Sequence, residues 1–161
     1  MDGMLIREIQ KGDNVQIAVV IREVFISDDY PKTGTVFADT QLDFMFETYD
    51  NPRAAYFVVE ENGKILGGAG ISQLESSKEN ICELQKMYFL KGARGKGLGL
   101  QMIEKCLAIA TEFGYSNCYL ETLPEMLVAQ SLYKKVGFEY LCTPLGNTGH
   151  TTCPVWMIKQ L

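Results

Sequence analysis

Three glycines at alternate positions, Gly95, Gly97 and Gly99, stand between an apolar segment and a segment with helical periodicity. Glycine has no Cβ, so backbone amides can approach a ligand closely. The unpaired amides at the start of a helix, together with the positive end of its dipole, attract anions. Arg94 and Lys96 place positive charge beside this turn. The pattern therefore predicts a site for a ligand that carries phosphate.

Two common phosphate-binding sequences do not fit this turn. Counted from Gly95, the dinucleotide pattern G-x-G-x-x-G would need a glycine where Leu100 stands. The P-loop pattern G-x-x-x-x-G-K-[ST] fails as well, because Leu90 occupies its first glycine position and Gly97 follows the lysine. The residues do match R-x-x-G-x-G, formed by Arg94, Gly97 and Gly99.

This motif resembles the pyrophosphate-binding signature of the GNAT superfamily of N-acetyltransferases. The resemblance is close from Cys82 to Tyr140, and the order of predicted elements extends it over nearly the whole chain. It implies acetyl-CoA as co-substrate, with pyrophosphate held at the turn and pantetheine bonded by the backbone of the preceding strand. The positions that it assigns to cofactor binding are Met87, Tyr88, Phe89, Arg94, Gly95, Lys96, Gly97, Leu98, Gly99 and Tyr133.

Transfer of an acetyl group to an amine needs a base for the ammonium and an acid for the departing thiolate. Glu83, on the strand before the turn, matches the position of a catalytic glutamate in some GNAT enzymes. The resemblance implies a base, although a glutamate there could also only bind the ammonium or face solvent. Strand alternation places Glu83, Gln85, Met87 and Phe89 on one face, unless a bulge intervenes.

Tyr133 lies in A-x-x-L-Y-x-x-x-G-F, an element that looks like the one whose tyrosine contacts the CoA sulfur in the family. The resemblance implies that Tyr133 is the general acid. A tyrosine at this helical spacing would also suit the apolar core. Where many members carry an asparagine seven residues earlier, this chain has Met126, so we expect that hydrogen bond to be either lost or replaced by one from Thr122 or Glu121.

The resemblance implies an acceptor site opposite the cofactor, shaped by the first two helices and by the loop that joins the last two strands. Residues 28–50 carry six acidic side chains and one lysine, which would favour a cationic acceptor unless they only form a solvated surface. The only histidine, His150, is either a pocket residue or a structural loop residue, and a thiol mechanism with Cys153 has no third group to support it. Candidate substrate residues are Phe25, Tyr30, Glu83, Glu121 and His150.

These side chains must be positioned by a sheet with helices around it. Hydrophobic periodicity predicts strands at 4–9, 53–60, 64–74, 81–90, 117–121, 138–142 and 155–160, with helices at 14–25, 41–49, 100–113 and 124–136. This order indicates one α/β domain over residues 1–161. The resemblance implies a mixed, mostly antiparallel central sheet of about seven strands flanked by about four helices, splayed between the fourth and fifth strands.

Composition argues against several classes of protein. A net charge of −5 argues against a nucleic-acid partner, and no apolar run has the length of a membrane span. Five cysteines without a C-x-x-C pair predict neither a disulfide framework nor a metal site, and they favour a cytoplasmic protein.

Taken together, the residues and the resemblance predict acetyl transfer from acetyl-CoA to a primary amine of a small molecule by direct attack. Two alternatives stay open, an acyl-CoA-binding sensor or scaffold without turnover and a protein amine acetyltransferase. A homodimer would be compatible with such an enzyme.

Overall fold

The computed structural model describes residues 3–161, so the first two residues of the predicted domain lie outside the described part. A single seven-stranded sheet runs through the molecule in the order β1-β2-β3-β4-β5-β7-β6. Its strands are β1 (Met4–Glu8), β2 (Ala55–Glu61), β3 (Lys64–Gln73), β4 (Ile81–Phe89), β5 (Asn117–Thr122), β6 (Glu139–Leu141) and β7 (Val155–Gln160). All neighbours are antiparallel except β4 and β5, which confirms the predicted mixed sheet.

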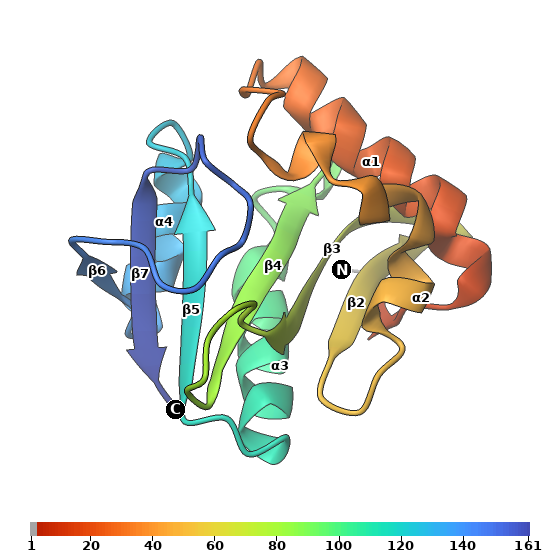
Figure 1. The fold of residues 1–161 in the computed structure, drawn as a ribbon. Helices are drawn as coiled ribbons and strands as arrows, with labels where there is room; N and C mark the ends of the chain where they lie inside the picture. The colour runs from red at the N-terminus through yellow and green to blue at the C-terminus, as the bar shows by residue number, and fades with distance from the viewer. Residues whose placement is uncertain (1–2) are drawn as a thin grey trace.

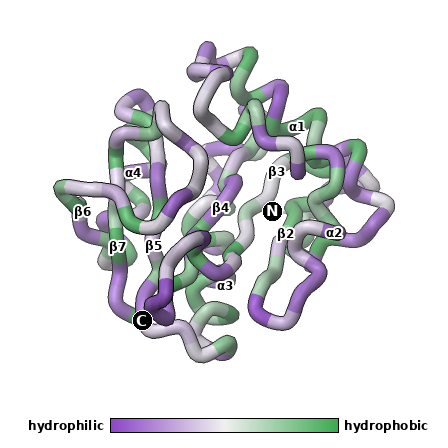
Figure 2. The backbone as a smooth tube through the Cα atoms, viewed as in Figure 1, coloured by the Kyte–Doolittle hydropathy of each residue, from purple (hydrophilic) through white to green (hydrophobic). Residues whose placement is uncertain are grey.

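Helices cover both faces of this sheet (Figure 1). The α-helices are α1 (Asn14–Ser27), α2 (Met45–Tyr49), α3 (Leu98–Glu112) and α4 (Leu127–Lys135), and the 3-10 turns are η1 (Lys11–Asp13), η2 (Val36–Ala38), η3 (Thr40–Phe44) and η4 (Lys91–Ala93). One core lies between α1, α2 and the sheet, and a second lies under α3 and α4. Both hydrophobic and hydrophilic stretches occur along α1, as expected for a helix with one buried face (Figure 2).

The parallel strands β4 and β5 pair over only three residues each. The partners are Ile81 with Asn117, Cys82 with Cys118 and Glu83 with Tyr119. Beyond Glu83 the two strands diverge (Figure 1), and the predicted splay between the fourth and fifth strands is confirmed. The rest of β4 therefore has an edge without a strand partner on the side of β5.

A β-bulge changes the face that the second half of β4 presents. Gln85 pairs with Gly70, but the next pair is Tyr88 with Gly68, so β4 has one extra residue. Lys86, within this step, has a positive φ of 52°. As a result Met87 and Phe89 pack against the core under α3 and α4. The expectation that they share a face with Glu83 and Gln85 is wrong, because the bulge interrupts the alternation.

Two predicted helices differ at their ends. The helix expected over 41–49 begins as the 3-10 turn η3, and only Met45–Tyr49 is α-helical. The helix expected over 124–136 is shorter, at Leu127–Lys135. Within residues 3–161 no helix has the length and hydropathy needed to cross a bilayer.

Candidate active site

Two adjoining pockets open where β4 and β5 diverge. The larger has a volume of about 560 Å³ and is lined by β4, the glycine turn and α4. The smaller has a volume of about 30 Å³ and is lined by Glu83, Glu121, Tyr133 and His150 among others. Met87, Tyr88 and Met126 line both pockets, so the two spaces meet beside the bulge.

The glycine turn ends in a set of free amides at the start of α3. Gly95 and Gly97 have φ angles of 75° and 78°, which side chains with a Cβ rarely adopt. The first helical bond of α3 joins the Gln101 amide to the Gly97 carbonyl at 3.2 Å. The amides of residues 98–100 are thus left without a helical partner and lie beside the larger pocket. This arrangement suits an anionic ligand.

The remaining residues of the motif have different roles. Arg94 donates from Nη2 to Asp28 at 2.8 Å and from Nε to the Phe89 carbonyl at 2.9 Å, so it ties the end of α1 to the end of β4. A Cβ on Gly99 would lie 2.9 Å from Leu132 Cδ1, so this glycine permits close packing of α3 on α4. Lys96 is exposed and is absent from the lining of the larger pocket.

The backbone of β4 offers hydrogen-bonding groups to the larger pocket. The Leu90 amide donates to the Leu66 carbonyl on β3 at 2.8 Å. Because backbone groups alternate in direction along a strand, those of Tyr88 also face β3, whereas those of Met87 and Phe89 face the opening toward β5. The predicted pantetheine positions therefore lie on the unpaired edge.

Glu83 is a buried carboxylate, only 4% exposed. Its carboxylate accepts a hydrogen bond of 2.6 Å from the side-chain amide of Gln85. The side-chain oxygen of Gln85 in turn accepts one of 2.6 Å from the Tyr49 hydroxyl. Burial raises the pKa of Glu83 from 4.5 to about 7, against the opposing effect of the Gln85 bond. A carboxylate with this pKa can accept a proton near neutral pH.

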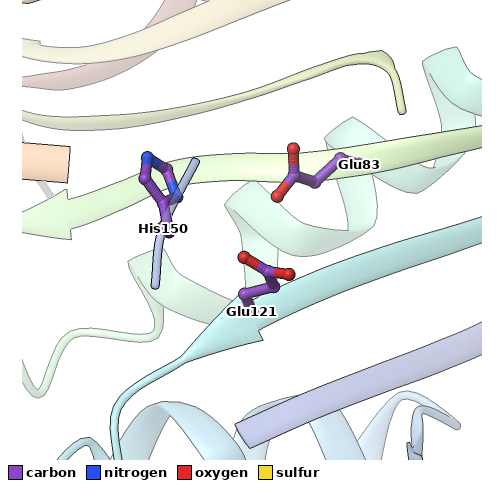
Figure 3. A group of neighbouring side chains, drawn as sticks. All are labelled: Glu83, Glu121 and His150. Atoms are coloured by element: carbon purple, nitrogen blue, oxygen red, sulfur yellow. The ribbon is translucent and has the colours of Figure 1, made fainter. Parts of the chain in front are cut away.

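Glu83, Glu121 and His150 point toward one another from β4, β5 and the loop between β6 and β7 (Figure 3). One N or O atom from each lies within 4.8 Å of the others. Glu121 is held by hydrogen bonds from the hydroxyls of Tyr119 and Thr148. Two carboxylates and one imidazole at this spacing suit a cation, either a protonated amine or a metal ion.

Asp39 completes this group, and sequence reasoning missed it. His150 Nε2 lies 2.9 and 3.0 Å from the two oxygens of Asp39, and Lys86 Nζ lies 3.6 Å from one of them. Burial would lower the pKa of His150, but the hydrogen bond and charge of Asp39 outweigh it and the net direction is upward. Burial lowers the pKa of Lys86 despite the nearby carboxylates.

Tyr133 lines the smaller pocket with Glu83, which agrees with the spacing of its motif. Its ring packs edge-on against Phe138, with centroids 5.8 Å apart. Burial raises the pKa of Tyr133, so the hydroxyl keeps its proton at neutral pH. Thr122 donates from Oγ1 to the Met126 sulfur at 3.3 Å, which gives that methionine a polar contact at the junction of the pockets.

The other two predicted substrate residues, Phe25 and Tyr30, pack edge-on with ring centroids 5.7 Å apart, but they line different pockets. Phe25 is fully buried in the core under α1 and lines the smaller pocket. Tyr30 lines the larger pocket with Arg94, on the side predicted for the cofactor. Cys153 also lines the smaller pocket, and burial raises its pKa to about 12, so it is a poor nucleophile.

Comparison with known proteins identifies the class. The model of the acetyltransferase (GNAT) family matches residues 21–138. The chain therefore belongs to the GNAT family of N-acetyltransferases, and the recognition made from its motifs is confirmed. It is 43% identical over 160 residues to an uncharacterized N-acetyltransferase, YjgM, of Escherichia coli K12, covering 98% of this chain and 95% of that one.

Solved structures share the fold at lower identity. A GNAT-family acetyltransferase from Staphylococcus aureus Mu50 superposes with a TM-score of 0.87 at 20% identity, covering 98% of this chain and 99% of that one. A phosphinothricin acetyltransferase from Sinorhizobium meliloti, solved in complex with AcCoA, has a TM-score of 0.78 at 20% identity, with coverage of 99% and 89%. These likenesses support the architecture and its splayed sheet.

Proposed function

We propose that this N-acetyltransferase moves an acetyl group from acetyl-CoA to a primary amine of a small, cationic molecule by direct attack. Glu83 takes a proton from the ammonium, the neutral amine attacks the acetyl carbonyl carbon, and the C–S bond of the thioester breaks. Tyr133 gives its proton to the departing thiolate. The nitrogen loses its second proton as the amide forms, and this proton restores the Tyr133 hydroxyl, so each proton and electron pair has a stated donor and acceptor.

One observation carries the proposal. Glu83 and Tyr133, a carboxylate with a raised pKa and a tyrosine that stays protonated, line the same pocket. That pocket meets the larger one at Met87, beside the unpaired edge of β4. An acid and a base placed at the junction of two ligand spaces are what transfer between a thioester and an amine requires.

The larger pocket suits acetyl-CoA. Free amides at the start of α3 would hold the pyrophosphate, and the backbone of Met87 together with the Phe89 amide would bond the pantetheine arm as an added strand. The volume of about 560 Å³ lies within the range of small-molecule sites. The structure of the Sinorhizobium meliloti relative with AcCoA is consistent with this donor.

The smaller pocket favours a small cationic acceptor. Acidic side chains outnumber lysines around this pocket, with Glu83, Glu121 and Asp39 against the buried Lys86. This excess of negative charge would attract a protonated amine. This pocket has a volume of only about 30 Å³, which suits a small molecule better than a folded protein surface and disfavours a protein amine as acceptor.

The test is release of free thiol from acetyl-CoA across a panel of polyamines, amino-acid derivatives, aminoglycosides and lysine-containing peptides. We expect turnover with small cationic amines, unchanged by a metal chelator. Acetyl-CoA binding without turnover on any amine would favour the sensor alternative. Faster turnover with peptides than with small amines would contradict the small-molecule assignment.

A further inference from the structure

His150 and Asp39 form a partly buried pair that the acetyl-transfer steps above do not use. They lie 111 residues apart in sequence, yet Nε2 of the imidazole is 2.9 Å from the nearer oxygen of the carboxylate. Hydrogen bonds from Thr152 to the carbonyls of Gly34 and Thr33 hold the same two segments together. The pair is therefore fixed by its surroundings and does not depend on one contact.

The pair connects a buried group to the surface. Glu83 is 4% exposed, whereas the side chains of His150 and Asp39 are 13% and 18% exposed. A ring nitrogen of His150 lies within 4.8 Å of a carboxylate oxygen of Glu83, and one water molecule can bridge that distance. Asp39 holds Nε2, so Nδ1 is the ring nitrogen that is free to exchange a proton. Among residues 3–161, no protein group is hydrogen-bonded to Nδ1.

We propose that His150 is the exit for the proton that the acceptor amine releases, and that Asp39 is the positioning residue that holds its imidazole. This inference rests on the proposed function of Glu83. The proton leaves the ammonium for the Glu83 carboxylate and then passes through water to Nδ1 of His150. The imidazolium that forms is stabilised by Asp39 and gives this proton from Nδ1 to a water molecule that leads to solvent, which returns His150 to its neutral form and Glu83 to its charged form for the next cycle.

The surrounding charges suit such a transfer. The charged or titratable groups that face His150 are Asp39 before η3, Glu83 and Lys86 on β4, Glu121 on β5 and Cys153 on its own loop. The pKa of Glu83 rises to about 7 and that of His150 rises above its ordinary value of 6.5, so both groups exchange protons near neutral pH. Asp39 also stabilises the imidazolium, as carboxylates beside a catalytic histidine do.

Chemical rescue tests the relay. His150→Ala should lower turnover roughly tenfold or more at pH 7 in dilute buffer, and added imidazole should restore it in proportion to its concentration. Wild type and Asn147→Ala, an exposed position on the same loop, should not respond to imidazole. Acetyl-CoA binding, measured by thermal shift, shows that each variant is folded. A slow His150→Ala enzyme that imidazole does not accelerate would overturn the relay.

A second measurement is independent of turnover. The chain has one histidine, so an NMR titration of the untagged protein reports on His150 without assignment. We expect a pKa above 6.5 that falls in Asp39→Asn. A pKa that does not move in that variant would refute the positioning role. If wild type acetylates no amine, the proposed function fails first. If wild type is active and Glu83→Gln is equally active, only the assigned proton path fails.

Discussion

Replacing Glu83 by glutamine should make the protein more stable at high pH while it removes activity. The folded protein holds the Glu83 proton until about pH 7, whereas the unfolded chain releases it near 4.5. Between these values the unfolded state binds fewer protons, so the free energy of unfolding falls as the pH rises. Glutamine keeps the shape and the bond from Gln85 without ever carrying a charge.

The size of the effect follows from the two pKa values. A rise from 4.5 to about 7 corresponds to about 3 kcal/mol, because one pKa unit is about 1.4 kcal/mol. Glu83→Gln should therefore match wild type below pH 4.5 and exceed its free energy of unfolding by up to about 3 kcal/mol above pH 7. In a domain of this size that gain raises Tm by about 6–12 °C.

The assay is denaturant unfolding from pH 4.5 to pH 9, with Glu139→Gln as the control. Glu139 lies exposed on β6, so the same chemical change there should leave the pH dependence unaltered. Activity is measured in parallel. Wild-type kcat/KM should fall below pH 7, and the defect of the variant should shrink at high pH, where the amine is itself neutral. Equal pH dependence of stability in wild type and Glu83→Gln would refute the burial argument, and an equal rate defect at every pH would refute the base role.

The other predictions concern the donor site, the acid and the buried cation. Tyr133→Phe should lower turnover by about 10²-fold or more, measured by steady-state kinetics, with little change in acetyl-CoA affinity, measured by thermal shift. If the variant keeps wild-type turnover, Tyr133 is a core residue only. Gly97→Asp should abolish the rise of Tm with acetyl-CoA, whereas Gly114→Asp, with a similar φ of 84° at the other end of α3, should keep it. Lys86→Met removes a positive charge that lowers the pKa of Glu83. The decrease in kcat/KM toward acidic pH should therefore begin at a higher pH in this variant than in wild type.

The parts of the site that sequence predicted depend on local signals. The turn from Gly95 to Gly99 needs positive φ angles at closely spaced positions, and glycines at those positions reveal it directly. The strand with Glu83 and the helix with Tyr133 follow from periodicity and from residues close in sequence. Their arrangement around a splayed sheet came from resemblance to a family, since periodicity does not specify which strands pair.

The parts that sequence did not predict are set by contacts between distant segments. A lysine rarely adopts the φ of 52° that Lys86 has, and nothing in the residues around it indicates a bulge. The conformation is held from β2, because the Tyr56 hydroxyl donates to the Lys86 carbonyl at 2.8 Å. Asp39 contributed to sequence reasoning only as one of many acidic residues. Its pairing with His150 depends on how two loops meet in three dimensions.

The splay that creates the site also leaves the protein incomplete without its ligand. An unpaired strand edge in the middle of a sheet exposes amides and carbonyls that would otherwise be bonded. On β4 this edge begins beyond Glu83, and the start of α3 adds further free amides a few residues later. A pantetheine arm with a pyrophosphate would satisfy both sets, so cofactor binding should stabilise the fold by mass action, by about 2.7 kcal/mol at a hundredfold excess over Kd. The burial that raises the pKa of Glu83 to about 7 destabilises the fold at neutral and higher pH, which is why Glu83→Gln and the addition of acetyl-CoA should both raise Tm there.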